Sequence, residues 1–182
     1  MKSCSQTCSD YVLKVSPFGL RSYIRGGRQE KESDVKVITS GGTGYLSRET
    51  IAKNVDVIDK FKVVIGYLNP DRAGVNNSSQ GSNVTTKVMV YEPGVVITES
   101  YIVIGVFNNE KDAYNYASYI KCKFTRMLIN LTLSSIHITQ GNFRFVPLQD
   151  FTRPWTDADL YAKYNLTDEE IQFIESMIKP ME

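Results

Sequence analysis

The chain has 182 residues, of which 42% are hydrophobic and 23% are charged, and these values are typical of a single globular domain. They exclude a collagen, a coiled-coil rod and a wholly disordered chain. The charge is uneven: residues 1–149 contain 18 Lys and Arg against 12 Asp and Glu, a net of +6, whereas residues 150–182 contain 3 against 8, a net of −5. We therefore expect one domain in which an acidic tail segment (150–182) follows a basic body. The body is expected to span 17–149, after a polar leader at 1–16.

The first half of the chain alternates short apolar runs with Gly-containing segments. In chain order it predicts one or two helical turns at 9–16, an Arg-rich loop or hairpin at 20–34, a strand at 35–39, a turn at 41–44 followed by a short strand near Tyr45, a helix at 47–54 and a strand at 61–68. Residues 69–83 contain almost no apolar side chain and predict a long loop, and loops of that length are commonly functional.

The second half is dominated by one amphipathic pattern. In chain order it predicts strands at 87–91 and 95–106 joined as a hairpin by Pro93-Gly94, one long helix at 110–134 capped by Asn109, a strand at 142–147, and two short helices capped by Thr156 and Thr167. The order of these elements predicts an α+β fold with a mainly antiparallel sheet, one long packed helix and two short C-terminal helices. We expect Trp155 to pack these helices onto the body.

The motifs of common DNA-modifying and hydrolytic enzymes are missing. No two prolines are adjacent, as an adenine amino-methyltransferase would need, and Gly44 is followed by Tyr45 rather than by the Lys of a P-loop. A nucleophilic site would have to use the single histidine, His137. Pro70-Asp71 is not followed by the acid and lysine of a magnesium nuclease, because Asp34-Val35-Lys36 lies upstream. We therefore expect no catalytic centre in this chain.

Cofactor and metal sites are also not expected. The three cysteines are Cys4, Cys8 and Cys122, and with one histidine in the chain they offer few ligands for a closed zinc site. The odd number of cysteines, and the lack of an apolar stretch after the first residues, predict free thiols in a reducing cytoplasm. No apolar run is long enough to cross a membrane.

Basic and amide side chains gather in three segments and suggest contacts with nucleic acid. Arg and Lys bind phosphates, whereas Arg, Asn and Gln also bind base edges in the major groove. The candidate phosphate contacts are Arg21, Arg25, Arg28, Lys121, Lys123 and Arg126. The candidate base contacts are Arg72, Asn76, Asn77 and Gln80. Thr98, Glu99 and Ser100 are either structural polar groups or groove contacts. On these residues alone, the alternative is an ordinary solvated surface with a polar loop.

Six segments resemble one protein family in order and spacing. They are PFGLRS (17–22), ITSGGTGYLSRETI (38–51), DKFKVVIGYL (59–68), VITESYIVIGVF (96–107), YASYIKCKFTRMLI (116–129) and FRFVPLQDFTRPWTDADLYAKYNLTDEEIQFIESMIKP (143–180). The family is the bacterial type II restriction-modification enzymes that contain an adenine-specific DNA methyltransferase. The chain resembles their target-recognition region, which follows the methylase core, and the closing segment is the most specific part of the resemblance.

This resemblance implies recognition of a double-stranded DNA sequence, without catalysis by this chain. It also implies a partner, either a methylase or nuclease domain of the same protein or a separate subunit. Two alternatives remain from other functional classes. One is a small nuclease or hydrolase with an unfamiliar site, and the other is a protein-interaction module that docks on a methylase.

Overall fold

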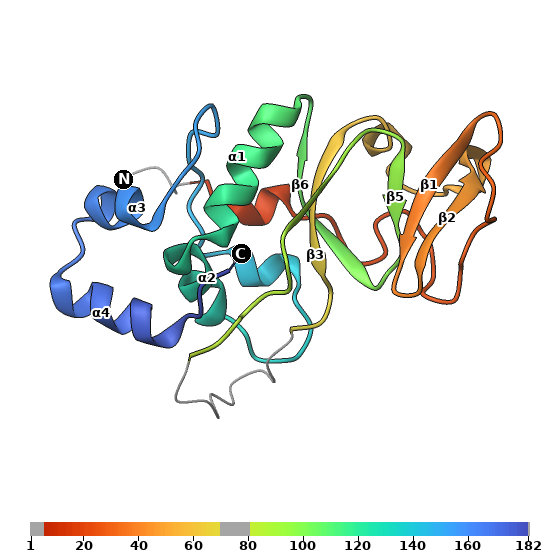
Figure 1. Ribbon diagram of the computed structural model, residues 1–182. Helices are drawn as coiled ribbons and strands as arrows, with labels where there is room; N and C mark the ends of the chain where they lie inside the picture. Colours follow the sequence, from red (N-terminus) through yellow and green to blue (C-terminus); the bar gives the residue numbers. More distant parts are fainter. Residues whose placement is uncertain (1–5, 70–80, 182) are drawn as a thin grey trace.

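The computed structural model describes residues 6–69 and 81–181, which form two three-stranded sheets and four α-helices (Figure 1). The strands are β1 (Asp34–Thr39), β2 (Gly42–Ser47), β3 (Phe61–Gly66), β4 (Met89–Tyr91), β5 (Val95–Ile97) and β6 (Tyr101–Phe107). The helices are α1 (Glu110–Lys121), α2 (Lys123–Asn130), α3 (Asp157–Tyr164) and α4 (Asp168–Met177). Short 3-10 helices cover Cys8–Tyr11, Arg48–Thr50, Val55–Val57 and Gln140–Phe143. The predicted α+β class is confirmed.

The two sheets differ in their strand pairing. One has the order β2-β1-β5, in which β1 and β2 form an antiparallel hairpin and β1 runs parallel to β5. The other has the order β4-β3-β6 and is antiparallel throughout, with a register shift between Val63 and Val64. Three of the four pairings are antiparallel, in agreement with the mainly antiparallel sheet that the sequence predicts.

The central β3–β6 pair is buried on both faces and separates two hydrophobic cores. Because successive side chains of a strand point to opposite faces, Ile102 and Ile104 of β6 join the core under the helices, whereas Val103 joins the core shared with the β2-β1-β5 sheet. Figure 1 shows the same arrangement, with α1 to α4 on one side of β3 and β6 and the second sheet on the other. Burial on both faces explains why the sequence of β3 is largely apolar and does not alternate with polar residues.

The predicted hairpin between 87–91 and 95–106 is wrong. The segment after Pro93-Gly94 does not turn back onto β4, because β4 pairs with β3 and β5 pairs in parallel with β1. The expected long strand is also interrupted: the Tyr101 amide donates to the carbonyl of Thr98, and this bend carries the chain from the β5 sheet to the β6 sheet. Strands do lie within both predicted ranges, but which strands pair is determined by contacts between distant segments.

Two shorter predictions are also wrong. The strand expected at 142–147 is a 3-10 helix at Gln140–Phe143, in which Thr139 and Asn142 form a reciprocal capping box. The helix expected at 47–54 is replaced by 3-10 turns at Arg48–Thr50 and Val55–Val57. Both segments lie between regular elements, where a few local hydrogen bonds outweigh the weak propensity of a short window.

The single helix predicted over 110–134 is two helices. It breaks at Cys122, whose backbone adopts φ −57° and ψ 140°, and α2 then continues in a new direction. α1 packs with its Tyr116 face against β3 and β6, whereas α2 contacts α3 and α4. The expected N-cap is present, because the Asn109 side chain accepts a hydrogen bond from the Asp112 amide at 2.9 Å.

Both ends of the described chain pack into the core under the helices. Cys8 and Val12 are buried there, so the segment expected as a leader belongs to the body from at least residue 6.

Trp155 is 5% exposed and packs as expected. The two predicted caps are also confirmed, since Thr156 and Thr167 each form a capping box with the acidic residue three positions on. Among the described residues, no helix combines the length and apolar character that crossing a bilayer requires.

Candidate nucleic-acid interface

The Arg-rich segment packs closely against β2 through Gly26 and Gly27, which lie beside Gly44 and Tyr45 of that strand. Gly27 and Tyr45 exchange two backbone hydrogen bonds, of 2.7 and 3.0 Å, which extend the β2-β1-β5 sheet by one short bridge. The approach is very close, since a Cβ atom on Gly44 would lie 2.0 Å from the carbonyl oxygen of Arg25. Gly26 has φ +73°, and a Cβ atom there would lie 2.7 Å from the backbone nitrogen of Tyr45. The turn predicted at 41–44 is shorter than expected: the chain turns at residues 40–41, and Gly42 and Gly44 already belong to β2, where Gly44 packs against the Arg-rich segment.

Replacing Gly44 with alanine is expected to lower the free energy of unfolding by about 2 kcal/mol, because the added methyl group meets backbone rather than a flexible side chain. The matched control is Gly27→Ala, where a Cβ atom would make only ordinary contacts at 3.7 Å. Urea denaturation of the two variants measures the difference. Equal stability of Gly44→Ala and the wild-type protein would show that the Arg-rich segment is not seated on β2.

Arg25 and Arg28 are exposed on this seated segment. The Arg25 guanidinium donates to the carbonyls of Ser22 and Ile24, and its side chain lies beside Gly41 in the β1–β2 turn. Within residues 6–69 and 81–181, neither arginine takes part in an ion pair, so both positive charges face solvent without a carboxylate. Arg21 differs, because it forms an ion pair with Glu99 at 3.0 Å.

The three basic residues predicted on the long helix have different environments. The prediction is wrong for Arg126, which is 1% exposed and donates from Nε to the carbonyl of Lys121 at 3.0 Å. The Lys123 ammonium forms an ion pair with Glu175 of α4. Lys121 is partly buried in the last turn of α1. The break at Cys122 explains the error, because it turns α2 toward the C-terminal helices.

The acidic tail segment is thus a partner for the body. Besides the Lys123–Glu175 pair, the Asp157 carboxylate accepts a hydrogen bond from the Phe124 amide at 2.9 Å, at the start of α2. The pKa of Glu175 is lowered, first by its hydrogen bond from Lys123. The tail therefore pairs with Lys123 of α2, whereas Arg25 and Arg28 near the β1–β2 hairpin (Figure 1) take part in none of the ion pairs of the described residues.

The four predicted base contacts, Arg72, Asn76, Asn77 and Gln80, lie outside the described residues. The chain on either side is well anchored. Before them, the Asn69 amide donates to the carbonyl of Ile136 at 2.7 Å. After them, the Ser82 amide donates to the carbonyl of Met177 at 2.8 Å, at the end of α4.

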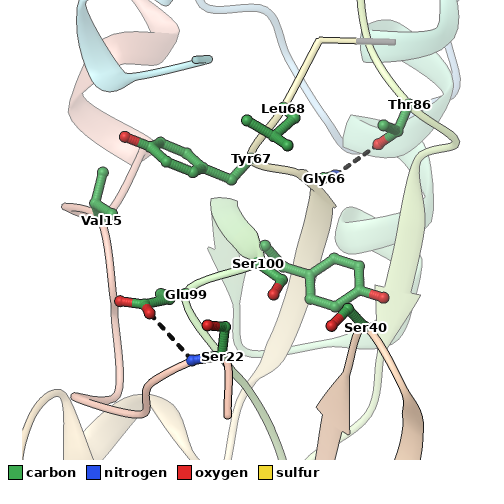
Figure 2. Close-up of a pocket in the computed structure, with 10 residues that line it drawn as sticks. Val15, Ser22, Ser40, Gly66, Tyr67, Leu68, Thr86, Glu99 and Ser100 are labelled. Atoms are coloured by element: carbon green, nitrogen blue, oxygen red, sulfur yellow. Dashed lines mark hydrogen bonds between the residues drawn. The ribbon is translucent and has the colours of Figure 1, made fainter. Parts of the chain in front are cut away.

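A cavity of about 500 Å³ lies where the two sheets meet, and sequence reasoning did not find it. Its mostly apolar lining includes Val15, Ser22, Ser40, Tyr67, Leu68 and Glu99 (Figure 2). These residues come from segments far apart in the sequence, so no local motif reveals the cavity. Glu99 of the VITESY segment is one of its polar groups, while Thr98 is fully buried beside it in the chain.

The described cysteines are buried, whereas the histidine is exposed. Burial raises the pKa of the Cys8 and Cys122 thiols to about 12, so both stay protonated and poorly nucleophilic at neutral pH. His137 is exposed, and its ring contacts that of Tyr67 with centroids 4.8 Å apart. Within the parts of the chain that the structure describes, no three His, Cys, Asp or Glu side chains gather as a metal site.

Comparisons with known proteins add no identification. No protein-family model matches the chain, and neither a curated protein nor a solved structure matches it. The resemblance to restriction-modification enzymes therefore remains a prediction from the sequence.

Proposed function

We propose that this chain is a DNA target-recognition module of a cytoplasmic restriction-modification system, which works with a methylase or nuclease partner. The observation that carries DNA binding is the seated Arg-rich segment, where Arg25 and Arg28 present unpaired positive charge beside the β1–β2 turn. The restriction-modification context comes from the six resembling segments of the sequence. Arg21 belongs to the same segment but is partly neutralised by Glu99.

Backbone contacts hold the Arg-rich segment in position. An arginine on a flexible loop loses conformational entropy when it binds a phosphate. Where backbone carbonyls already hold the guanidinium in the free protein, less entropy is lost on binding. Arg25 is held in this way by Ser22 and Ile24. Arg28 directly follows Gly27, whose pairing with Tyr45 fixes the backbone at the edge of β2. Together they form a small, preorganised basic site for the DNA backbone.

The double variant Arg25→Ala/Arg28→Ala is expected to bind duplex DNA at least tenfold more weakly than the wild-type protein. Non-specific dissociation constants are on the order of 10⁻⁴ to 10⁻⁶ M, and each lost phosphate contact lowers the salt slope by about one. A titration of random-sequence duplex at two salt concentrations measures both quantities.

Two control variants separate this surface from general charge loss. Arg48→Ala removes an exposed arginine that is already paired with Asp59, and Lys123→Ala removes a lysine that is paired with Glu175. Both are expected to bind DNA like the wild-type protein. Wild-type affinity and salt slope in the Arg25/Arg28 variant, or no DNA binding by the wild-type protein, would refute the proposal.

A further inference from the structure

The cavity between the sheets has the size and composition of a small-ligand site. Its volume of about 500 Å³ falls in the usual range for such sites, which are mostly apolar with a few placed polar groups. It is built where β1 and β3 end and at the bend between β5 and β6. Of its lining residues, Gly66 and Tyr101 lie in strands, and the others lie in connecting segments. At its floor, the Gly66 amide donates to the Thr86 hydroxyl at 2.6 Å, a bond drawn in Figure 2.

Glu99 is the charged group of this cavity and is fixed in position. One carboxylate oxygen accepts from the Ser22 amide at 3.1 Å and the other from Arg21 at 3.0 Å. These two hydrogen bonds, that of the Ser22 amide first, lower the pKa of Glu99, so it is a carboxylate at neutral pH. Each carboxylate oxygen has a second lone pair, and an ionised carboxylate only accepts hydrogen bonds. A ligand that reaches Glu99 must therefore bring N–H or O–H donors.

The other walls favour a flat, aromatic ligand. Tyr67 and Tyr101 both line the cavity, and the ring of Tyr67 is supported by the ring of His137. The Tyr101 hydroxyl donates to the carbonyl of Thr39 at 3.5 Å, which holds this side chain against the end of β1. Aromatic side chains with a hydrogen-bonding group at the edge are the usual way in which proteins hold a nucleobase outside the helix.

We propose that this cavity binds a nucleobase with an exocyclic amino group, guanine best, through hydrogen bonds to Glu99 and contact with the two tyrosines. Guanine presents N1–H and the 2-amino group side by side, which matches the two oxygens of one carboxylate. Thymine and uracil place a carbonyl on each side of their single N–H, and these oxygens repel the carboxylate. The base comes either from a free nucleoside or from an unpaired position in DNA, and only the DNA source rests on the function proposed above.

The first arm of the test uses free nucleosides and isothermal titration with the full chain. Guanosine is expected to bind more tightly than inosine, which lacks only the 2-amino group, and thymidine is expected to bind most weakly. Glu99→Gln is expected to weaken guanosine binding at least tenfold. Ser40→Leu, which fills the cavity from the exposed β1–β2 turn and leaves Glu99 intact, is expected to do the same. The control is Glu92→Gln, which removes an exposed carboxylate outside this cavity.

The second arm compares a duplex that carries one bulged guanine with the fully paired duplex. Preference for the bulged duplex that disappears in Glu99→Gln supports the cavity as a site for a base from DNA. Guanosine binding without any DNA binding supports the cavity but overturns the DNA-recognition function. DNA binding with no guanosine binding, and with no effect of Glu99→Gln or Ser40→Leu, overturns the cavity proposal and leaves DNA recognition standing. Circular dichroism shows that each variant is folded.

Discussion

Replacing Lys62 with methionine is expected to remove a rise of up to about 3 kcal/mol in the free energy of unfolding between pH 8 and pH 10.5. Lys62 lies in β3 and its side chain is completely buried. Its ammonium donates to the carbonyls of Val57, Ile58 and Lys60, at 3.2, 2.9 and 2.6 Å. Methionine has a similar volume but supplies no donor to these carbonyls and no charge.

The sign of this effect follows from the direction of the pKa shift. Burial lowers the pKa of Lys62 from 10.5 to about 8, while Asp59 acts weakly in the opposite direction. Between these two values the unfolded chain binds a proton that the folded protein does not, so stability increases as the pH rises. Below about pH 8 the lysine is charged in both states, and the full cost of burying its charge is present.

The comparison with Lys62→Met is needed because other groups titrate in the same range. The buried thiols of Cys8 and Cys122 have pKa values raised from 9.0 to about 12, and they lower the stability of both proteins as the pH rises above about 9. The difference in unfolding free energy between wild type and variant cancels their contribution. Urea denaturation at pH 7, 8, 9 and 10 measures it, and a difference that does not change with pH would contradict the prediction.

The variants Arg126→Ala and Arg126→Met are expected to differ in stability by about 2 to 4 kcal/mol, with alanine the less stable. Alanine leaves a cavity in the region between α2 and the chain near Asn83. It also removes the donors to the carbonyls of Lys121 and Asn83. Methionine removes the same donors but fills most of the volume, and hydrophobic replacement of a buried charge is often neutral or stabilising.

The Arg126 guanidinium makes methionine a favourable replacement. Burial lowers the pKa of Arg126, and among the described residues its second terminal nitrogen is buried without a hydrogen-bond partner. An unsatisfied buried group of this kind costs about 1 to 3 kcal/mol, which methionine avoids. Lys111→Ala, at an exposed position of α1, is the control and is expected to stay within about 0.5 kcal/mol of wild type.

Thermal or urea denaturation ranks the Arg126 variants, and DNA titration separates the structural role from a binding role. Both folded variants are expected to bind duplex DNA like the wild-type protein, since Arg126 is 1% exposed. Weaker DNA binding by a fully folded Arg126→Met protein, with a reduced salt slope, would show that Arg126 contacts a phosphate, as the sequence alone suggests. Equal stability of the alanine and methionine variants would contradict the packing role.

The sequence by itself determined the features that depend on neighbouring residues. The buried strand at Phe61–Gly66 and the caps at Asn109, Thr156 and Thr167 are local, because apolar periodicity and a side-chain cap involve residues within a few positions of one another. The α+β class follows from the order of such elements. A turn near Gly41 was likewise predictable, although the structure places Gly42–Gly44 in β2, where Gly44 makes a close contact with the Arg-rich segment.

The tertiary structure alone decided which segments meet. The parallel pairing of β5 with β1, in place of a hairpin, depends on contacts across more than fifty residues, and the break at Cys122 depends on α3 and α4. That break buries Arg126 and pairs Lys123 with Glu175. The sequence had predicted both residues as exposed phosphate contacts. The cavity around Glu99 arises in the same way. A side chain's exposure and its partners are properties of the packed chain, because the free energy of burial is shared among residues that are distant in the sequence.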